Sequence, residues 1–207
     1  MNHVMIDVET LGVSPDAAIV SIGAVRFDPI TGRVGDVGPT GGIAGGQLAC
    51  ASDRLHARIK FDSADLGEID ASTFEWWLGR SREAQDALLG GERLTLREAL
   101  SALTNWLQNG PKPEGIWAND PDFDLVLLRS AYKRVDRVFP YSFRLHRSVR
   151  TMQWLACQLG MMLPKTFNAL SHDALSDALC QAHIVSAIYA RLGLSYPEPP
   201  TIDEILR

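Results

Sequence analysis

Two carboxylates, separated by a single residue, lie inside an apolar run near the start of the chain. Side chains alternate between the two faces of a β-strand, so Asp7 and Glu9 project from the same face. Val4, Ile6 and Val8 project from the opposite face and are expected to enter the core. Paired carboxylates repel each other and lose hydration when they are buried. The pair therefore indicates either a divalent-cation site with oxygen ligands or an edge strand that is open to water.

The composition sets the class of protein. A chain of 207 residues is long enough for one domain with a sizeable core and short for two. The formal net charge of -5 predicts no broad basic surface for a nucleic-acid backbone. A polyanionic ligand would therefore be held locally, by metal ions and a few basic side chains.

Cysteine usage and the apolar runs predict the compartment. Cys50, Cys157 and Cys180 are odd in number, widely spaced and without a Cys-x-x-Cys pair, which favours reduced thiols. The N-terminus lacks the basic and apolar regions of a signal peptide, and no apolar run reaches the roughly 20 residues that span a bilayer. The expectation is a soluble cytoplasmic protein with no membrane partner.

The first third of the chain predicts three strands. Residues 3–9 and 18–28 are joined by a short segment that suits an antiparallel hairpin. Residues 32–53 are rich in glycine and small side chains and predict a mobile loop or an insertion. Leu55 to Phe61 alternates well enough for a third strand, which gives a three-stranded antiparallel start.

From residue 72 the apolar period changes from two to about 3.6, which predicts helices. Ser72–Glu75 and Thr95–Glu98 both fit capping boxes. The second box opens a helix that ends before Gly110. The expected helices cover residues 72–78, 82–89, 96–109, 124–135, 148–159 and 173–192, with a brief buried strand at 115–118.

Strands first, followed by helices that alternate with one or two further strands, predict an α/β domain with a mixed sheet flanked by helices. Residues 1–207 are expected to form a single domain. Its core covers about 3–192, and an extended tail covers 195–207.

A second acidic segment lies where the 115–118 strand would flow into a helix. Asp120, Asp122 and Asp124 suggest an EF-hand loop, but Leu125 stands where that loop needs glycine and Ala131 where it needs glutamate. Capping of the helix by Asp120, with Asp122 in the first turn, explains two of the acids. This interpretation leaves Asp124 as the acid of this segment that is available for a catalytic role.

The third segment contains His172 and Asp177. On one continuous helix, residues five positions apart are separated by about 140°. The two side chains therefore converge more easily if His172 precedes the helix and Asp177 lies on it. A lone histidine is commonly a hydrogen-bonded surface residue, and Asp173 is explained equally well as an N-terminal helix charge. The remaining histidines, without comparable acidic surroundings, are read as structural: His3, His56, His146 and His183.

The combined pattern resembles the DEDDh family of 3′→5′ exonucleases. The motifs are Asp7-Val8-Glu9, then Phe123-Asp124 after Asn119, then His172 with Asp177. Each motif is short, but their order and placement together are specific, and the resemblance covers residues 3–192. The chain looks most similar to a phage and bacterial branch of exonuclease-VIII-like and small exoribonuclease proteins. The resemblance implies a ribonuclease-H-like fold.

The resemblance also implies a site with two Mg²⁺ or Mn²⁺ ions. Asp7, Glu9, Asp124 and Asp177 would be the metal ligands, with Asp7 as the bridge. Two such ions clamp a scissile phosphate, and four carboxylates roughly balance their charge. His172 would be the general base, because imidazole changes its charge near neutral pH. The products would be nucleoside 5′-monophosphates.

Recognition of the terminal nucleotide is expected beside the first motif. The family pattern places Thr10 at the 3′-hydroxyl and Leu11 against the terminal base. Trp76 and Phe123 offer stacking faces. Adjacent helical residues cannot share a face, so at least one of Trp76 and Trp77 is expected in the core.

Basic residues near residue 135 are candidates for contacts with phosphates. Lys133, Arg134 and Arg137 end a predicted helix, where a solvated C-terminal charge cluster is an equally good interpretation. The next candidates are Arg144, Arg147 and Arg150.

The expected function is therefore metal-dependent 3′→5′ exonuclease activity on the 3′ ends of single-stranded RNA or DNA. The alternatives are a catalytically idle nucleic-acid-binding module of the same fold and a ribonuclease-H-like endonuclease. Relatives often work as homodimers, so a homodimer is expected by analogy. No motif reads the 2′-hydroxyl, and the choice between RNA and DNA stays open.

Overall fold

The computed structural model describes residues 1–35, 43–44, 47–48, 53–163 and 172–196. A seven-stranded mixed sheet lies at its centre, in the order β7-β6-β2-β1-β8-β9, with β3 also paired to β2. The strands of this sheet are β1 (His3–Thr10), β2 (Ile19–Asp28), β3 (Arg33–Val34), β6 (Arg54–Ile59), β7 (Arg93–Leu94), β8 (Gly115–Ala118) and β9 (His146–Ser148). A separate ribbon pairs β4 (Ile43–Ala44) with β5 (Gln47–Leu48).

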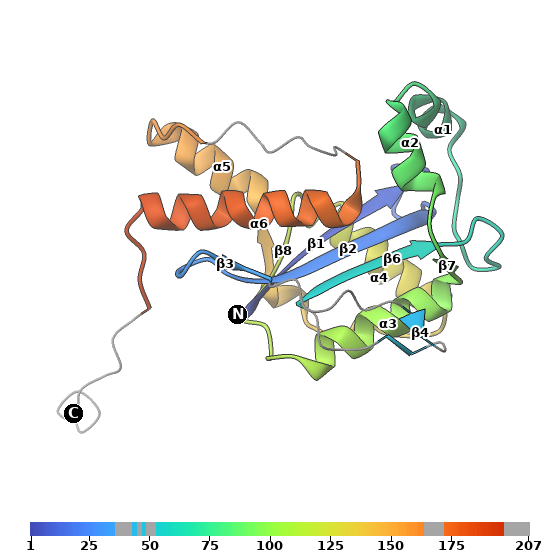
Figure 1. Ribbon diagram of the computed structural model, residues 1–207, viewed down its shortest axis with the longest axis horizontal. Helices are drawn as coiled ribbons and strands as arrows, with labels where there is room; N and C mark the ends of the chain where they lie inside the picture. Colours follow the sequence, from blue (N-terminus) through green and yellow to red (C-terminus); the bar gives the residue numbers. More distant parts are fainter. Residues whose placement is uncertain (36–42, 45–46, 49–52, 164–171, 197–207) are drawn as a thin grey trace.

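Helices cover both faces of the sheet. In the described part of the chain they are α1 (Ala71–Leu78), α2 (Arg82–Leu89), α3 (Leu96–Asn109), α4 (Asp124–Arg134), α5 (Val149–Gln158) and α6 (Ala174–Arg191), with a 3₁₀ turn η1 (Phe143–Leu145). Helices α5 and α6 lie on one face and α3 and α4 on the other (Figure 1). The mixed sheet flanked by helices confirms the predicted fold class.

The apolar pattern of β1 explains the two layers of core. Val4, Ile6 and Val8 pack with buried side chains of α3 and α4, whereas Met5 packs with those of α5 and α6. This alternation follows from the period of two in a strand. It places Asp7 and Glu9, which share the face of Met5, on the α6 side of the sheet.

Strand directions place the second acidic segment beside the first. β1, β2 and β6 are antiparallel neighbours, which confirms the predicted three-stranded start. β8 runs parallel to β1. The C-terminal ends of these two strands therefore lie at the same edge, and the chain that leaves β8 begins α4 close to the end of β1.

The predicted helix caps are partly correct. The capping box at Thr95 and Glu98 is present at the start of α3. The box at Ser72 is wrong, because α1 begins at Ala71 and the Asp70 carboxylate accepts the Thr73 main-chain N–H at 2.9 Å. An aspartate two residues earlier both caps the helix and favours its dipole.

The cap predicted at Asp120 is also wrong. Helix α4 begins at Asp124, and its N-cap residue, Phe123, makes no side-chain cap bond. The Asp120 carbonyl accepts the main-chain N–H groups of Phe123 and Asp124, which forms a turn ahead of the helix.

Other sequence-based expectations differ at the ends of elements. The third strand, β6, ends at Ile59 instead of Phe61. Strands β3, β7 and β9 were not predicted, because two or three residues show no periodicity, and β3, β4 and β5 fall in the Gly-rich 32–53 segment. Most of that segment and residues 197–207 of the expected tail lie outside the described residues.

Two expectations from composition can be compared with the structure. Cys157 and Cys180 form no disulfide in the described part of the chain, and Cys50 lies outside it. Among the described helices, none has the length and apolar character that crossing a bilayer requires.

A glycine in β2 allows α6 to approach the sheet closely. Gly23 lies opposite Asp7 in the β1–β2 pairing. A Cβ atom at this position would lie 2.2 Å from the main-chain carbon and oxygen of Ala174. Because Ala174 is the first residue of α6, the missing side chain lets the start of this helix rest directly on β2, next to the acidic pair.

This contact predicts the effect of Gly23→Ala. The added methyl group meets main chain and not a flexible side chain, so we expect a loss of about 1–3 kcal/mol in the free energy of unfolding, or more. Urea denaturation measures it. Gly79→Ala is the control, because its Cβ would lie no closer than 3.4 Å to its neighbours, and its effect should stay within about 0.5 kcal/mol. Equal stability of Gly23→Ala and the wild type would contradict the close approach.

Candidate active site

The acidic pair of β1 is buried at the edge where three elements meet. Asp7 is 8% exposed and Glu9 is 9% exposed. The β1–β2 pairing becomes irregular between Glu9 and Thr10, directly after the pair. Irregular pairing of this kind bends a strand and redirects its side chains, and it is common beside active sites. The alternative interpretation, an edge strand with both carboxylates open to water, is therefore wrong for this pair.

Asp124 reaches the pair from the first turn of α4. Its carboxylate accepts the main-chain N–H of Val8 and that of Asp120, each at 3.3 Å. The first of these bonds ties α4 to β1 at the residue between Asp7 and Glu9. The strand-end position predicted from the sequence therefore brings Asp124 to the pair.

His172 and Asp177 complete the cluster from the start of α6. His172 precedes the helix in the left-handed backbone region, with φ of 73°, and its N–H donates to Asp177 Oδ2 at 3.1 Å. One side-chain donor atom each from Glu9, His172 and Asp177 lies within 4.8 Å of the other two. The two side chains thus converge in the way their spacing predicts, with His172 outside the helix and Asp177 on it.

Gln181 is a residue of the site that sequence reasoning missed. It lies one helical turn beyond Asp177, and its Nε2 donates to Asp7 Oδ1 at 2.7 Å. Its other polar atom, Oε1, is buried and has no hydrogen-bond partner among the described residues. The only signal in the sequence is the spacing of four from Asp177, which places both side chains on one face of the helix.

Burial and mutual repulsion raise the pKa values of the carboxyl groups. Burial, then the charges of Asp124 and Glu9, raise the pKa of Asp7 well above its ordinary range. Burial, then the charge of Asp177, raise the pKa of Glu9 to about 8. Burial raises the pKa of Asp124 to about 6 and also raises that of Asp177. Without cations, the cluster therefore holds protons at neutral pH.

The donor set fits hard divalent cations. Carboxylate oxygens from three elements converge, and such oxygens are the ligands that Mg²⁺ and Mn²⁺ prefer. The buried Oε1 of Gln181 adds an oxygen for which the described part of the chain supplies no hydrogen-bond partner. Cations would also remove the repulsion that raises the pKa values.

Two tryptophans form a wall around His172. The ring of His172 lies edge-on to both, with centroids 5.0 Å from Trp76 and 5.8 Å from Trp77. Trp77 is 3% exposed and its Nε1 donates to the Thr10 carbonyl at 2.9 Å. Trp76 is 41% exposed, with the Arg80 guanidinium 4.3 Å from its centroid. Trp77 is therefore the core residue of the two, and Trp76 offers an open face.

The other predicted nucleotide-binding residues lie close by, in less open positions. The Thr10 hydroxyl donates to the Gly12 carbonyl at 2.7 Å. Leu11 is 3% exposed and belongs to the core cluster of the α3–α4 face. Phe123 is partly buried and packs against the same cluster. Leu11 thus offers little free surface to a base in this conformation.

Asp173 and His56 form a supporting layer behind the acidic cluster. The Asp173 carboxylate caps α6 and lies 3.5 Å from Arg58 and 3.6 Å from His56 Nε2. His56 also shares a hydrogen bond with the Ser21 hydroxyl at 3.0 Å. The prediction that His56 lacks acidic surroundings is therefore wrong. Strand β6, which carries His56, and helix α6, which Asp173 caps, both lie against β2 and bring the two side chains together.

Comparison with known proteins gives one family and several similar folds. Residues 2–189 match the family described as the 3′-5′ exoribonuclease Rv2179c-like domain. The nuclease domain of 3′hExo, a DEDDh family member bound to rAMP, is 12% identical with a TM-score of 0.54, covering 91% of this chain and 92% of that one. Cell-death related nuclease 4 is 13% identical with a TM-score of 0.59, covering 97% and 71%. No curated protein matches by sequence.

The raised pKa of Glu9 predicts how the cation-free protein responds to pH. A carboxyl group whose pKa is raised by folding favours the folded state at low pH and disfavours it as pH rises towards 8. Glu9→Gln removes this charge. In the presence of a chelator, we expect the variant to exceed the wild type in free energy of unfolding by about 3–5 kcal/mol near pH 8 and by about 1 kcal/mol or less near pH 5. Urea denaturation at both pH values measures it, and a gain of equal size at both would contradict the raised pKa.

Proposed function

The chain belongs to the Rv2179c-like 3′-5′ exoribonuclease domain family, and from this membership we propose that it removes nucleoside 5′-monophosphates from the 3′ ends of single-stranded RNA. The observation that carries the proposal is the cluster of the buried Asp7, Glu9 and Asp124 with the partly buried Asp177, and with His172 at its rim. RNA is proposed over DNA because the family is one of exoribonucleases.

The four carboxylates would hold two Mg²⁺ or Mn²⁺ ions. When bound, such a pair supplies charge stabilisation for the attacking and leaving oxygens of a phosphate displacement. Asp7 would help to hold both ions, because its carboxyl group lies close enough to Asp124 and Glu9 for their charges, after burial, to raise its pKa. Gln181 would fix the orientation of the Asp7 carboxylate through its hydrogen bond.

His172 would act as the general base. It would accept a proton from a water molecule whose oxygen attacks the terminal phosphorus, while the bond to the 3′-oxygen of the preceding nucleotide breaks. Its backbone is held by the bond to Asp177, and its ring is held by Trp76 and Trp77. These contacts restrict the imidazole to the rim of the cluster.

The terminal nucleotide would bind between the end of β1 and the exposed tryptophan. Trp76 presents its open face beside His172 and would stack on a base, an interaction worth about 1–3 kcal/mol. Phe123, Thr10 and Leu11 are the other proposed contacts, and Leu11 would need a local shift to expose its side chain.

The single domain over 1–207 and the homodimer also stay predictions.

Two substitutions test the roles in the cluster. Asp7→Asn should abolish hydrolysis of end-labelled RNA, whereas His172→Gln should lower turnover by about 10²–10⁴-fold. Calorimetric titration with Mn²⁺ separates the roles, because His172→Gln should keep the affinity of the wild type. Asp122→Asn is the matched control, since Asp122 is exposed two positions from Asp124, and it should retain activity. A full rate for Asp7→Asn would contradict the assignment.

The polarity and the sugar are tested by the substrate. RNA with a 3′-phosphate should resist digestion, while the same strand with a free 3′-hydroxyl should yield 5′-monophosphates one at a time. A DNA strand of the same sequence should be digested more slowly. Cleavage of a circular RNA would indicate an endonuclease, and tight binding of RNA without any hydrolysis would indicate an idle binding module.

A further inference from the structure

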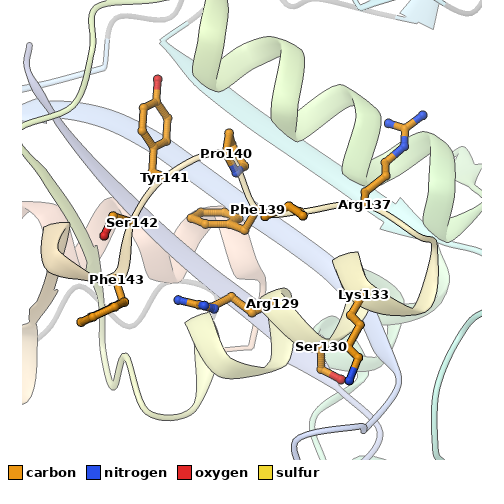
Figure 2. Close-up of a pocket in the computed structure, with 10 residues that line it drawn as sticks. Arg129, Ser130, Lys133, Arg137, Phe139, Pro140, Tyr141, Ser142 and Phe143 are labelled. Atoms are coloured by element: carbon orange, nitrogen blue, oxygen red, sulfur yellow. The ribbon is translucent and has the colours of Figure 1, made fainter.

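A groove lies along the outer side of α4, away from the acidic cluster. Its volume is about 690 Å³. Figure 2 shows that α4 and the segment after it contribute the lining, which includes Arg129, Lys133, Arg137, Tyr141 and Phe143. None of the described residues that line it is acidic. A local concentration of positive charge on a chain of net charge -5 calls for a specific ligand.

Two basic side chains of the groove have no ion-pair partner among the described residues. In the described part of the chain, neither Arg129 nor Lys133 has a carboxylate within ion-pair distance. The Arg137 guanidinium donates to the Ser101 hydroxyl at 2.6 Å. By contrast, Arg134 on the same helix lies 3.7 Å from Asp16 and donates to the carbonyl of Leu66 at 3.1 Å. Arg134 is therefore the structural member of the basic cluster formed by Lys133, Arg134 and Arg137.

An exposed aromatic ring lies beside these cations. Phe143 is 63% exposed at the start of η1, whereas Tyr141 packs partly against the core and donates its hydroxyl to the Leu107 carbonyl at 3.3 Å. Cations next to an exposed ring suit single-stranded nucleic acid, because phosphates pair with the cations and a base stacks on the ring. In Figure 2 the Arg129 side chain extends towards Phe143, and Arg137 lies on the far side of the view from Phe143.

The groove follows the exposed face of α4, on the side of the helix opposite the buried Asp124. Val126, Arg129 and Lys133 are exposed and spaced by three and four positions, so they share one face of the helix. With a rise of 1.5 Å and a turn of about 100° per residue, Arg129 lies about 7.5 Å and Lys133 about 13.5 Å along the axis from Asp124, and they project about 140° and about 180° around the helix from it. A strand whose 3′ end occupies the cluster would therefore cross over α4, whose diameter is about 10 Å, to reach the groove with its upstream nucleotides.

We propose that this groove binds the nucleotides upstream of the scissile bond in a single-stranded RNA substrate. Arg129 and Lys133 pair with backbone phosphates, Arg137 extends the basic path, and Phe143 stacks on an upstream base. This inference rests on the proposed function, since it extends the substrate path of that site. It predicts that substrates with upstream nucleotides gain affinity from the groove and that substrates without them do not.

Binding of RNA without turnover provides the first test. In an Asp7→Asn background, the affinity for a fluorescent RNA of about 12 nucleotides is measured by anisotropy over a series of salt concentrations. The pair Arg129→Gln and Lys133→Gln should weaken binding about tenfold and lower the salt slope by about 1.4, as expected for two lost phosphate contacts. Phe143→Ala should weaken binding by about tenfold without changing the slope.

The control variant carries the same change of charge elsewhere. Lys112→Gln with Arg191→Gln removes two exposed positive charges that lie outside the groove. This variant should bind RNA nearly as well as the background protein, with a small change of slope. An equal loss in the control and the groove variant, or an unchanged affinity and slope in the groove variant, would overturn the proposal.

A small substrate separates the groove from the catalytic cluster. The p-nitrophenyl ester of a nucleoside 5′-monophosphate has no upstream nucleotide, so the groove variants should hydrolyse it with wild-type kcat/KM. On the longer RNA the same variants should show a raised KM with little change in kcat. Loss of ester hydrolysis in the groove variants would contradict a role limited to upstream nucleotides. Failure of the wild type on both substrates would instead contradict the proposed function, and the binding measurement would still test the groove.

Discussion

Mutual repulsion among buried carboxylates is the constraint on which the site depends. Asp7 and Glu9 come from β1, Asp124 from α4 and Asp177 from α6, and no local segment could force them together. The surrounding fold opposes the repulsion by specific means. Gly23 lets α6 rest on β2, the Val8 N–H binds the Asp124 carboxylate, and Gln181 binds Asp7. The cost of this arrangement appears as carboxyl pKa values that are raised by burial and by neighbouring charge.

The same constraint links the fold to the proposed chemistry. A buried acidic cluster is neutralised either by protons or by cations, and hard divalent cations match its oxygen donors. Because the carboxylates are fixed by the sheet and two helices, bound cations would find their ligands already oriented. The proposed roles outside the cluster fall to more exposed parts of the fold. His172 precedes a helix, Trp76 is open to solvent, and the groove beside α4 lies on an exposed helix face.

Sequence patterns predicted the parts of the structure that depend on local periodicity. The alternation in β1 placed Asp7 and Glu9 on one face, and the spacing of His172 and Asp177 placed them on either side of a helix start. Contacts between distant segments left weaker signals. Gln181 carries no charge, Gly23 acts by an absent side chain, and His56 meets Asp173 only because β6 and α6 both lie against β2. Short strands such as β9 have no period to detect. The cap predicted at Ser72 was wrong because the nearby Asp70 fills that position, and the cap predicted at Asp120 was wrong because a turn separates Asp120 from the start of α4.

The central claim is that Asp7, Glu9, Asp124 and Asp177 form one site for two divalent cations. Anomalous diffraction from crystals grown with Mn²⁺ and a nucleoside 5′-monophosphate tests it most directly. Two anomalous peaks are predicted among these four carboxylates, both in contact with Asp7, with the phosphate of the nucleotide beside them and His172 at the rim. Peaks at another place on the protein, or a cluster that stays free of Mn²⁺ at saturating concentration, would contradict the account.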